Sequence, residues 1–178
     1  MADEFVNANA DKEEENIYLR LTHDTLDAKS IMDQVRSPSC GAIVLFAGTT
    51  RDNFQGKPVK HLAYSSYESL AIRTMRQIAL QVKTKHQLHG IAIVHRLGMV
   101  PIGEESILIA VSSPHRQAAW AAGEETLERV KDRVEIWKLE EFGGEDGGVW
   151  RANRDGQAGI KVADKDLSTF QATSRQSE

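Results

Sequence analysis

The hydrophobic positions along the chain follow two different periods, and each period predicts its own kind of element. Residues 17–22 (IYLRLT) alternate apolar and polar side chains, which predicts a strand. Residues 40–48 (CGAIVLFAG) form a continuous apolar run of strand length, which is typical of a strand covered on both faces. The same two signals predict further strands at 59–69, 90–98, 105–113 and 133–141.

Three other segments carry apolar residues at helical spacing. Residues 24–35 predict a short helix with Asp24 as its capping residue. Residues 70–87 predict a long amphipathic helix. A second long helix is predicted from 114 to 131, with Ser113 as its N-cap.

The predicted elements follow the order β-α-β-β-α-β-β-α-β, with a polar loop at 49–58. This order predicts an α/β or α+β domain in which two long helices pack on one sheet. The 178 residues suit a single domain. We expect it to span 17–158, after an acidic leader (1–16) and before a polar C-terminal tail (159–178), both flexible.

The charge balance argues against a nucleic-acid partner. The chain has 22 Lys and Arg against 26 Asp and Glu, a net charge of -4. Residues 1–16 hold six of the acids and one lysine, so the remaining body is close to neutral. A near-neutral body does not predict the basic face that binds DNA or RNA.

The sequence also favours the cytosol over a membrane or an export route. No apolar run approaches the length of a membrane span, and acids stand where a signal peptide would have a basic region. The single cysteine, Cys40, excludes an internal disulfide framework and fits a reducing compartment. Because it opens an apolar strand without a flanking base, a small core residue is favoured over a nucleophile.

The segment "RVKDRVEIWKLEEFGG" (129–144) carries the main candidate chemistry. Lys131 is predicted to end the second long helix and Lys138 to lie on the following strand, next to Trp137. A helix-to-strand reversal could bring both ammonium groups to one pocket, where they would handle an anion or an acyl group. Two solvated surface lysines remain the alternative.

The segment "SSPHR" at the start of the same helix is a second candidate. A helix N-terminus offers unpaired backbone N–H groups to an anion. His115 and Arg116 are cations at the end where the helix dipole disfavours them, which makes sense if an anion lies between them. Ion pairs with neighbouring carboxylates are the alternative.

Two further candidates are weaker. The loop "GTTRDNFQGK", with Arg51 and Lys57, could hold phosphate, but its spacing is not that of a Walker loop and a solvated loop is favoured. His86, His89 and His95 have no further ligand at a known metal-site spacing, so we expect no metal.

Together these segments resemble the large, catalytic subunit of molybdopterin synthase. The resemblance is carried by "AGTTRDNFQGK", "YESLA", "IVHRLGMVPIGEESILIAVSSPHRQAA", "VKDRVEIWKLEEF" and "VWRANR", and it covers residues 17 to 155. It implies a hammerhead-like α/β domain with two long helices on a mixed sheet and an additional small antiparallel sheet.

The resemblance also implies a function. That family inserts two sulfurs into cyclic pyranopterin monophosphate, which forms the dithiolene of molybdopterin in molybdenum cofactor biosynthesis. The sulfur arrives as a thiocarboxylate on the C-terminal Gly-Gly of a small ubiquitin-like subunit. The assembly is a heterotetramer built on a homodimer of large subunits, and no cofactor is implied.

The residues that match the family's site are expected to keep its roles. Lys131 and Lys138 correspond to the catalytic lysines, with Lys131 at the thiocarboxylate tail. The residues expected to bind the substrate are Arg51, His115, Arg116, Lys131, Lys138, Leu139, Glu140 and Arg154, the last of them reaching a pocket across the large-subunit dimer.

One residue departs from the family pattern. Glu135 stands where members often have proline, so the start of the last predicted strand, and with it the position of Lys138, could differ. Two other functions are alternatives. A docking module could bind a ubiquitin-like tail without chemistry. A phosphate-ester enzyme using Arg51 and Lys57 ranks last, because it lacks a metal-binding carboxylate set.

Overall fold

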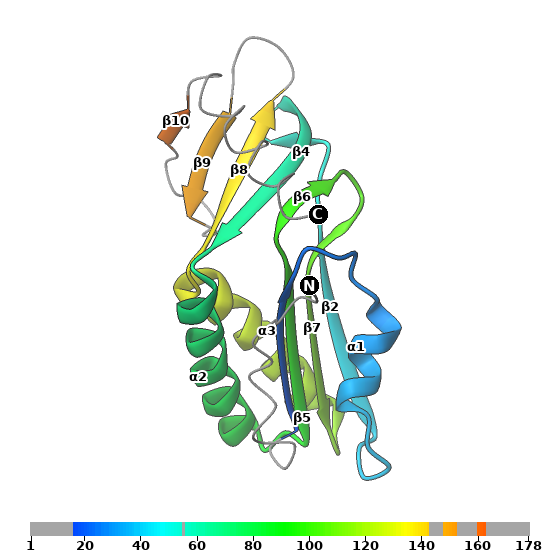
Figure 1. Cartoon of the computed structure of the whole chain (residues 1–178). Helices are drawn as coiled ribbons and strands as arrows, with labels where there is room; N and C mark the ends of the chain where they lie inside the picture. The colour runs from blue at the N-terminus through cyan, green and yellow to red at the C-terminus, as the bar shows by residue number, and fades with distance from the viewer. Residues whose placement is uncertain (1–15, 55, 143–147, 153–159, 163–178) are drawn as a thin grey trace, which may run out of the picture.

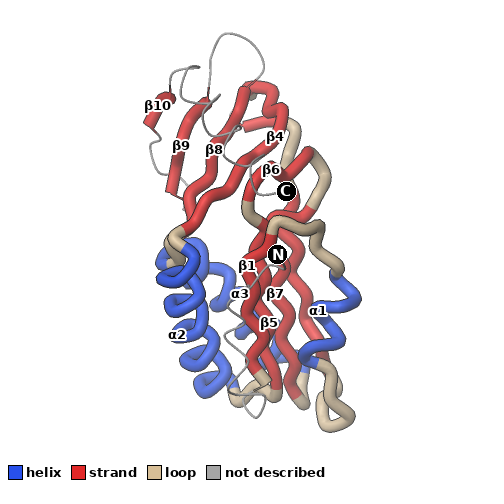
Figure 2. Tube along the Cα trace, in the orientation of Figure 1, coloured by secondary structure: helices blue, strands red, loops and turns tan. Residues whose placement is uncertain are grey.

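The computed structural model describes residues 16–54, 56–142, 148–152 and 160–162, which form three helices and two sheets (Figures 1 and 2). The elements in chain order are β1 (Ile17–Thr22), α1 (Ala28–Val35), β2 (Ala42–Thr49), β3 (Asn53–Phe54), β4 (Lys57–Ser66), α2 (Glu68–His86), β5 (Gly90–Arg96), β6 (Gly98–Pro101), β7 (Glu105–Ser113), α3 (Arg116–Arg133), β8 (Ile136–Phe142), β9 (Gly148–Ala152) and β10 (Ile160–Val162). The predicted leader and tail lie almost wholly outside these ranges.

The first sheet is mixed, and its strand order is β1-β5-β7-β2. β1 runs parallel to β5, whereas β5 and β2 both pair antiparallel with the central strand β7. The apolar runs of β5 and β7 place them at the centre, where nearly every residue is buried. The mixed sheet is therefore as predicted.

Helices cover both faces of this sheet, and the period of two along the strands sorts the core between them. Alternate residues of the central strands, such as Ile93 and Ile109, join the core under α2 and α3. Their neighbours, such as Ala92 and Ala110, join a smaller core under α1. Figure 1 shows α2 and α3 on one face and α1 on the other. The prediction of helices on one sheet was right for the long pair but did not place α1 opposite them.

The second sheet stands at one end of the first, with strand order β10-β9-β8-β4-β3 and with β6 paired to β4 (Figure 2). All its pairings are antiparallel. β4 leads directly into α2, and α3 leads directly into β8, so the two long helices and the second sheet meet at one junction. This is the additional antiparallel sheet that the family resemblance implied.

The prediction for β2 is right in part and two other strand predictions were wrong. β2 is covered by helices on both faces, as predicted, but it is an edge strand, so only Val44 is fully buried along it. The predicted loop at 49–58 contains β3 and the start of β4, with Gly56 in the left-handed region (φ 78°) between them. No separate strand was predicted after β5, where β6 pairs with β4.

Two predicted helix caps are also wrong. α1 is capped by Asp27, whose carboxylate accepts a hydrogen bond from the Lys29 backbone N–H at 2.9 Å, and not by Asp24. α3 begins at Arg116 with His115 as its N-cap residue, two residues later than the predicted start after Ser113. In both cases the helix begins later because the residues before it are held in extended or turn conformation.

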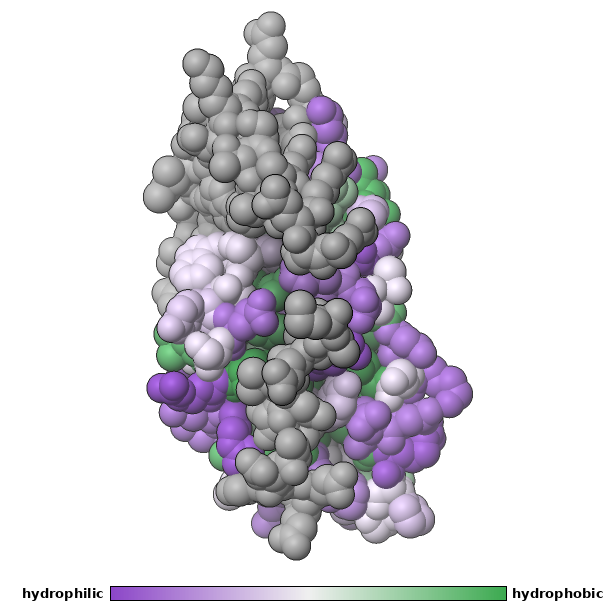
Figure 3. All heavy atoms as spheres, in the orientation of Figure 1, coloured by the Kyte–Doolittle hydropathy of each residue, from purple (hydrophilic) through white to green (hydrophobic). Residues whose placement is uncertain are grey.

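The outer surface over α1 is hydrophilic (Figure 3). Lys29 and Arg36 both form ion pairs with Asp33 on this helix, at 2.6 and 3.0 Å. The hydrogen bonds from these two cations hold the pKa of Asp33 below its usual value. Within the part of the chain that the structure describes, no helix has the length and apolar character needed to cross a membrane.

Candidate active site

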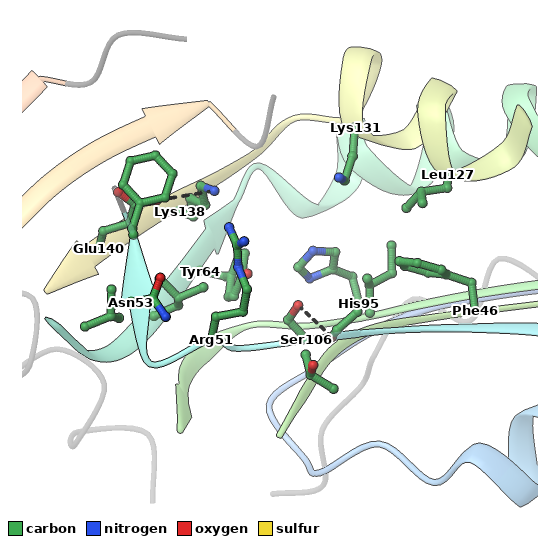
Figure 4. Close-up of a pocket in the computed structure, with 16 residues that line it drawn as sticks. Phe46, Arg51, Asn53, Tyr64, His95, Ser106, Leu127, Lys131, Lys138 and Glu140 are labelled. Atoms are coloured by element: carbon green, nitrogen blue, oxygen red, sulfur yellow. Dashed lines mark hydrogen bonds and ion pairs between the residues drawn. The ribbon is translucent and has the colours of Figure 1, made fainter. Parts of the chain in front are cut away.

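A cavity of about 140 Å³ lies where the two sheets and α3 meet (Figure 4). Its wall is formed by the end of β2, the loop after β2, and β3, β4, β5, β7, α3 and β8. The residues that line it are Phe46, Gly48, Thr49, Arg51, Asn53, Phe54, Val59, Leu62, Tyr64, His95, Ser106, Ile107, Leu127, Lys131, Lys138 and Glu140.

The two candidate lysines do meet at this cavity. Lys131 lies in the last turn of α3 and Lys138 lies on β8, as predicted, and the reversal at Val134 brings them to the same space. In Figure 4 the side chain of Lys131 descends from the helix while that of Lys138 reaches in from the sheet. Trp137 lies on the opposite face of β8 from Lys138, as the period of two predicts, and it is 42% exposed, so its ring does not line the cavity.

Lys138 is held in place by Glu140 and Phe54. Its Nζ lies 3.4 Å from Oε1 of Glu140, and the two side chains are 17% and 2% exposed. The same Nζ lies 5.9 Å from the centre of the Phe54 ring, within the range of a cation–π contact. Strand alternation places Lys138 and Glu140 on one face of β8, so both point into the cavity.

Glu135, the residue that replaces the family's common proline, does not displace this strand. Its Oε1 accepts a hydrogen bond from Thr74 on α2 at 3.2 Å, and its backbone carbonyl accepts one from Ser66 at 2.9 Å. These two bonds fix the entry into β8. Lys138 accordingly keeps its position in the cavity wall.

Arg51 joins the lysines from the segment that connects β2 to β3. Figure 4 shows its guanidinium rising toward Lys138. The lining residues therefore include three basic side chains, Arg51, Lys131 and Lys138, against one carboxylate, Glu140. Such an excess of positive charge in a recess favours an anionic ligand.

The floor of the cavity is polar but uncharged, and the sequence analysis did not anticipate it. His95 comes from the end of β5, Ser106 from the start of β7 and Tyr64 from β4. The rings of Tyr64 and His95 meet edge to face, with centroids 4.9 Å apart. Ser106 donates a hydrogen bond to the carbonyl of Gly48 at 3.2 Å.

Burial keeps both rings of this floor neutral. It raises the pKa of Tyr64, and the nearby Glu140 carboxylate adds to the shift, whereas hydrogen bonding with Ser106 opposes it. Burial lowers the pKa of His95 from 6.5 to about 4, with the hydrogen bond to the carbonyl of Arg96 acting in the opposite direction. At neutral pH the floor therefore offers hydrogen bonds without charge.

Several predicted site residues lie elsewhere. His115 and Arg116 begin α3 whereas Lys131 is near its end, so about 22 Å of helix separates them within one chain. Leu139 is 3% exposed and lies on the opposite face of β8 from Lys138. Arg154 lies outside the described residues.

The remaining candidates of the sequence analysis have other environments. Cys40 is half-buried in the turn before β2, and not inside the strand as expected. His86 contacts Glu125 at 2.6 Å, far from His95 in the fold. Within the described ranges, no three His, Cys, Asp or Glu side chains come together in a group that could hold a metal ion.

An apolar groove leads away from the cavity along α3 and the edge strand β2. Its volume is about 520 Å³, and it shares Phe46 and Leu127 with the cavity. Trp120 borders this groove on α3 and is 66% exposed. The cationic cavity thus adjoins a mainly apolar groove, and Phe46 and Leu127 border both.

Comparisons with known proteins agree on one family. The family model described as "MoaE protein" matches residues 21–133. The molybdopterin synthase catalytic subunit of Neurospora crassa is 62% identical over 165 residues, which cover 93% of this chain and 80% of that protein.

Solved structures point the same way. A molybdopterin synthase structure from Staphylococcus aureus is 33% identical, with a TM-score of 0.70 over 74% of this chain and 94% of the other. The fold is also shared with a chain in a complex of subunits 1 and 2 of molybdopterin-converting factor from Helicobacter pylori, at 23% identity and a TM-score of 0.60 over 70% and 85% of the two chains.

Proposed function

The chain belongs to the MoaE family, and we propose that it is the catalytic subunit of a molybdopterin synthase, a sulfur-transferring enzyme of molybdenum cofactor biosynthesis. It transfers sulfur from the C-terminal thiocarboxylate of a small ubiquitin-like subunit to cyclic pyranopterin monophosphate, forming the dithiolene of molybdopterin. We place the globular catalytic domain at residues 17–158 and the protein in the cytosol.

The observation that carries this proposal is the meeting of Arg51, Lys131 and Lys138 at one cavity. The reaction brings together negative charges on the thiocarboxylate tail and the substrate phosphate, and it develops another on the oxyanion of the acyl group. Cations fixed in a recess that excludes water stabilise such charges far more than cations in solution.

Each cation has a role that follows from its position. Lys131 reaches the cavity from α3, next to the apolar groove, so it meets the tail and stabilises the oxyanion. Lys138 is held by Glu140 at 3.4 Å, and this fixed position suits orientation of the pterin. Arg51, on the loop side of the cavity, contributes to binding of the anionic substrate.

The groove supplies a path for the partner's tail. An extended Gly-Gly end needs a narrow channel, and the side chains before it need an apolar surface. The groove between α3 and β2 offers the apolar surface, and it adjoins the cavity at Phe46 and Leu127. The exposed Trp120 would be covered by the small subunit.

His115 and Arg116 require a second copy of the chain. They cannot reach the cavity of their own chain, from which about 22 Å of α3 separates them. We place them, with Arg154, in the phosphate pocket of the other large subunit, so that each site of the homodimer is composite. The heterotetramer of two large and two small subunits follows from this arrangement.

A single-turnover assay tests the proposal. The protein is mixed with a Gly-Gly thiocarboxylated small subunit and cyclic pyranopterin monophosphate, and dithiolene formation is followed in wild type and Lys131→Ala. We expect a loss of at least about 100-fold in the variant. The matched control is Lys29→Ala, which removes a lysine from α1, on the other face of the first sheet.

The outcomes separate this function from a docking module. Product in wild type and in Lys29→Ala, with none in Lys131→Ala, supports the synthase. If folded wild type binds the small subunit but yields no dithiolene, the chain is a tail-binding module and the proposal fails. Near wild-type product from Lys131→Ala would refute the role of that lysine alone.

A further inference from the structure

The connection between β5 and β7 lies beside the cavity without lining it. His95 comes before this connection and Ser106 follows it, but none of the described residues that line the cavity comes from 96–105. The stretch "HRLGMVPIGE" (95–104) is nevertheless part of the segments that carry the family resemblance. The charged residues near its two ends, Arg96 and Glu104, must therefore act on the site, if at all, through other residues.

Arg96 and Glu104 form an ion pair that closes the base of this connection. Nη1 of Arg96 donates a hydrogen bond to Oε2 of Glu104. The Arg96 side chain is largely buried, so its charge is poorly compensated by water. Its Nε is also buried and has no acceptor within the described ranges, so the guanidinium depends on Glu104 for its compensation.

The turn that carries Glu104 holds the backbone of Thr50. In residues 101–104 the Glu104 N–H donates to the Pro101 carbonyl at 3.2 Å, and Gly103 takes a φ of 83°, which glycine adopts without strain. The Gly103 N–H then donates to the Thr50 carbonyl at 2.9 Å, and the Thr50 N–H donates to the Glu104 carbonyl at 3.0 Å. Because Thr50 is buried, water does not compete for these two bonds.

Thr50 directly precedes Arg51, one of the three cations of the cavity. On the other side of Arg51, the Asp52 carbonyl accepts a hydrogen bond from the Val59 N–H of β4 at 2.8 Å. The Arg51 backbone is thus held between two anchors, while its long side chain is exposed and reaches the cavity (Figure 4). A shift of either anchor would move the guanidinium with it.

We propose that Arg96 and Glu104 are positioning residues for Arg51. Their ion pair holds the 101–104 turn, the turn holds Thr50, and Thr50 fixes the point from which Arg51 reaches the anionic substrate. Neither residue touches the substrate. This inference rests on the proposed function, in which Arg51 binds that substrate, and it adds the pair that keeps Arg51 in place.

Two substitutions of Glu104 test the ion pair. Glu104→Ala removes it but leaves the backbone bonds to Thr50 possible, whereas Glu104→Gln keeps an acceptor for Arg96 without the charge. The matched control is Asp33→Ala, because the Asp33 side chain is also an ion-paired carboxylate, is 42% exposed against 43% for Glu104, and lies on α1. The rate of dithiolene formation is measured with saturating thiocarboxylated small subunit at increasing concentrations of cyclic pyranopterin monophosphate.

We expect Glu104→Ala to raise the substrate concentration that gives half of the maximal rate by about 10-fold, with a nearly unchanged maximal rate. Glu104→Gln should lie between Glu104→Ala and wild type, and Asp33→Ala should match wild type. A merely structural role for the ion pair would instead lower the amount of folded protein. The maximal rate would then fall, and the half-saturating concentration would stay the same.

A double substitution shows whether Glu104 acts through Arg51. If it does, Arg51→Ala combined with Glu104→Ala should have the same half-saturating concentration as Arg51→Ala alone. Independent effects that multiply in the double variant would overturn the inference, and so would an unchanged half-saturating concentration in Glu104→Ala. If Glu104→Ala does not fold, Glu104→Gln, which has the same side-chain size, is compared in the same way and decides by the same criteria. Absence of dithiolene in wild type overturns the proposed function itself, and this inference with it.

Discussion

The buried imidazole of His95 predicts a measurable dependence of stability on pH. Burial lowers the pKa of His95 from 6.5 to about 4. Between these values the unfolded chain binds a proton that the folded chain does not. The free energy of unfolding therefore falls as the pH drops through this window. The loss caused by His95 is complete only below about pH 4.

The size of the effect follows from the two pKa values. Between pH 7 and pH 5 the loss from His95 alone is about 2 kcal/mol. With a urea dependence of roughly 2 kcal/mol per molar, the unfolding midpoint should move down by about 1 M. Because His95 is 1% exposed, solvent screening does not reduce this figure as it would at the surface.

The assay compares urea unfolding of wild type and His95→Gln at both pH values and at one protein concentration. Glutamine does not titrate, so the variant should lose about 2 kcal/mol less than wild type between pH 7 and pH 5, whatever its stability at pH 7. Other titrating groups contribute equally to both chains and cancel. Equal losses in the two chains would show that the imidazole is not held neutral, and the reasoning on its burial would then be wrong.

Three further outcomes are expected. Glu125 accepts hydrogen bonds from Lys85 and His86, which lower its pKa from 4.5 to about 2 and outweigh the opposing effect of burial. Glu125→Gln should therefore lower the free energy of unfolding by about 1 kcal/mol at pH 7. In urea unfolding this difference should vanish as the pH falls from 4.5 to 2, and a difference that persists at pH 2 would contradict the assignment. Glu135→Pro should change the free energy of unfolding by about 1 kcal/mol or less and should retain dithiolene formation. The reason is that the extended backbone of Val134 (ψ 136°) already suits a following proline. A larger loss of stability would mean that the hydrogen bond from Thr74 to Glu135 contributes more than we infer. Cys40→Ala should keep wild-type turnover with thiocarboxylated small subunit, whereas complete loss in a folded chain would indicate a persulfide relay.

Periodicity located the central elements of the fold because burial there follows from the local pattern. The runs of β5 and β7 are buried on both faces, and the spacing in α2 and α3 matches the faces they bury. The run of β2 looks the same in sequence, but its position at the sheet edge leaves it half-exposed. Which strand has a missing neighbour is a property of the whole sheet, and no local pattern encodes it.

The candidate site, too, could be predicted only in part from the sequence. The change of period near Val134 was enough to place Lys131 on a helix and Lys138 on a strand. The family resemblance was needed to connect them with Arg51. His95 and Tyr64 were missed because they meet through pairings between distant strands, and a lone histidine in an apolar run carries no signal of what it faces.

The placement of Arg116 and Lys131 at opposite ends of α3 has a genetic consequence. A cell with one gene copy encoding Arg116→Ala and another encoding Lys131→Ala would assemble some mixed dimers. If each site combines Lys131 of one chain with Arg116 of the other, as proposed above, both defects of a mixed dimer fall on the same site. The other site then receives an intact lysine from one chain and an intact arginine from its neighbour. Two alleles that are inactive alone would thus restore molybdopterin synthesis together, whereas two alleles damaged at Lys131 and Lys138, which share one cavity, would not.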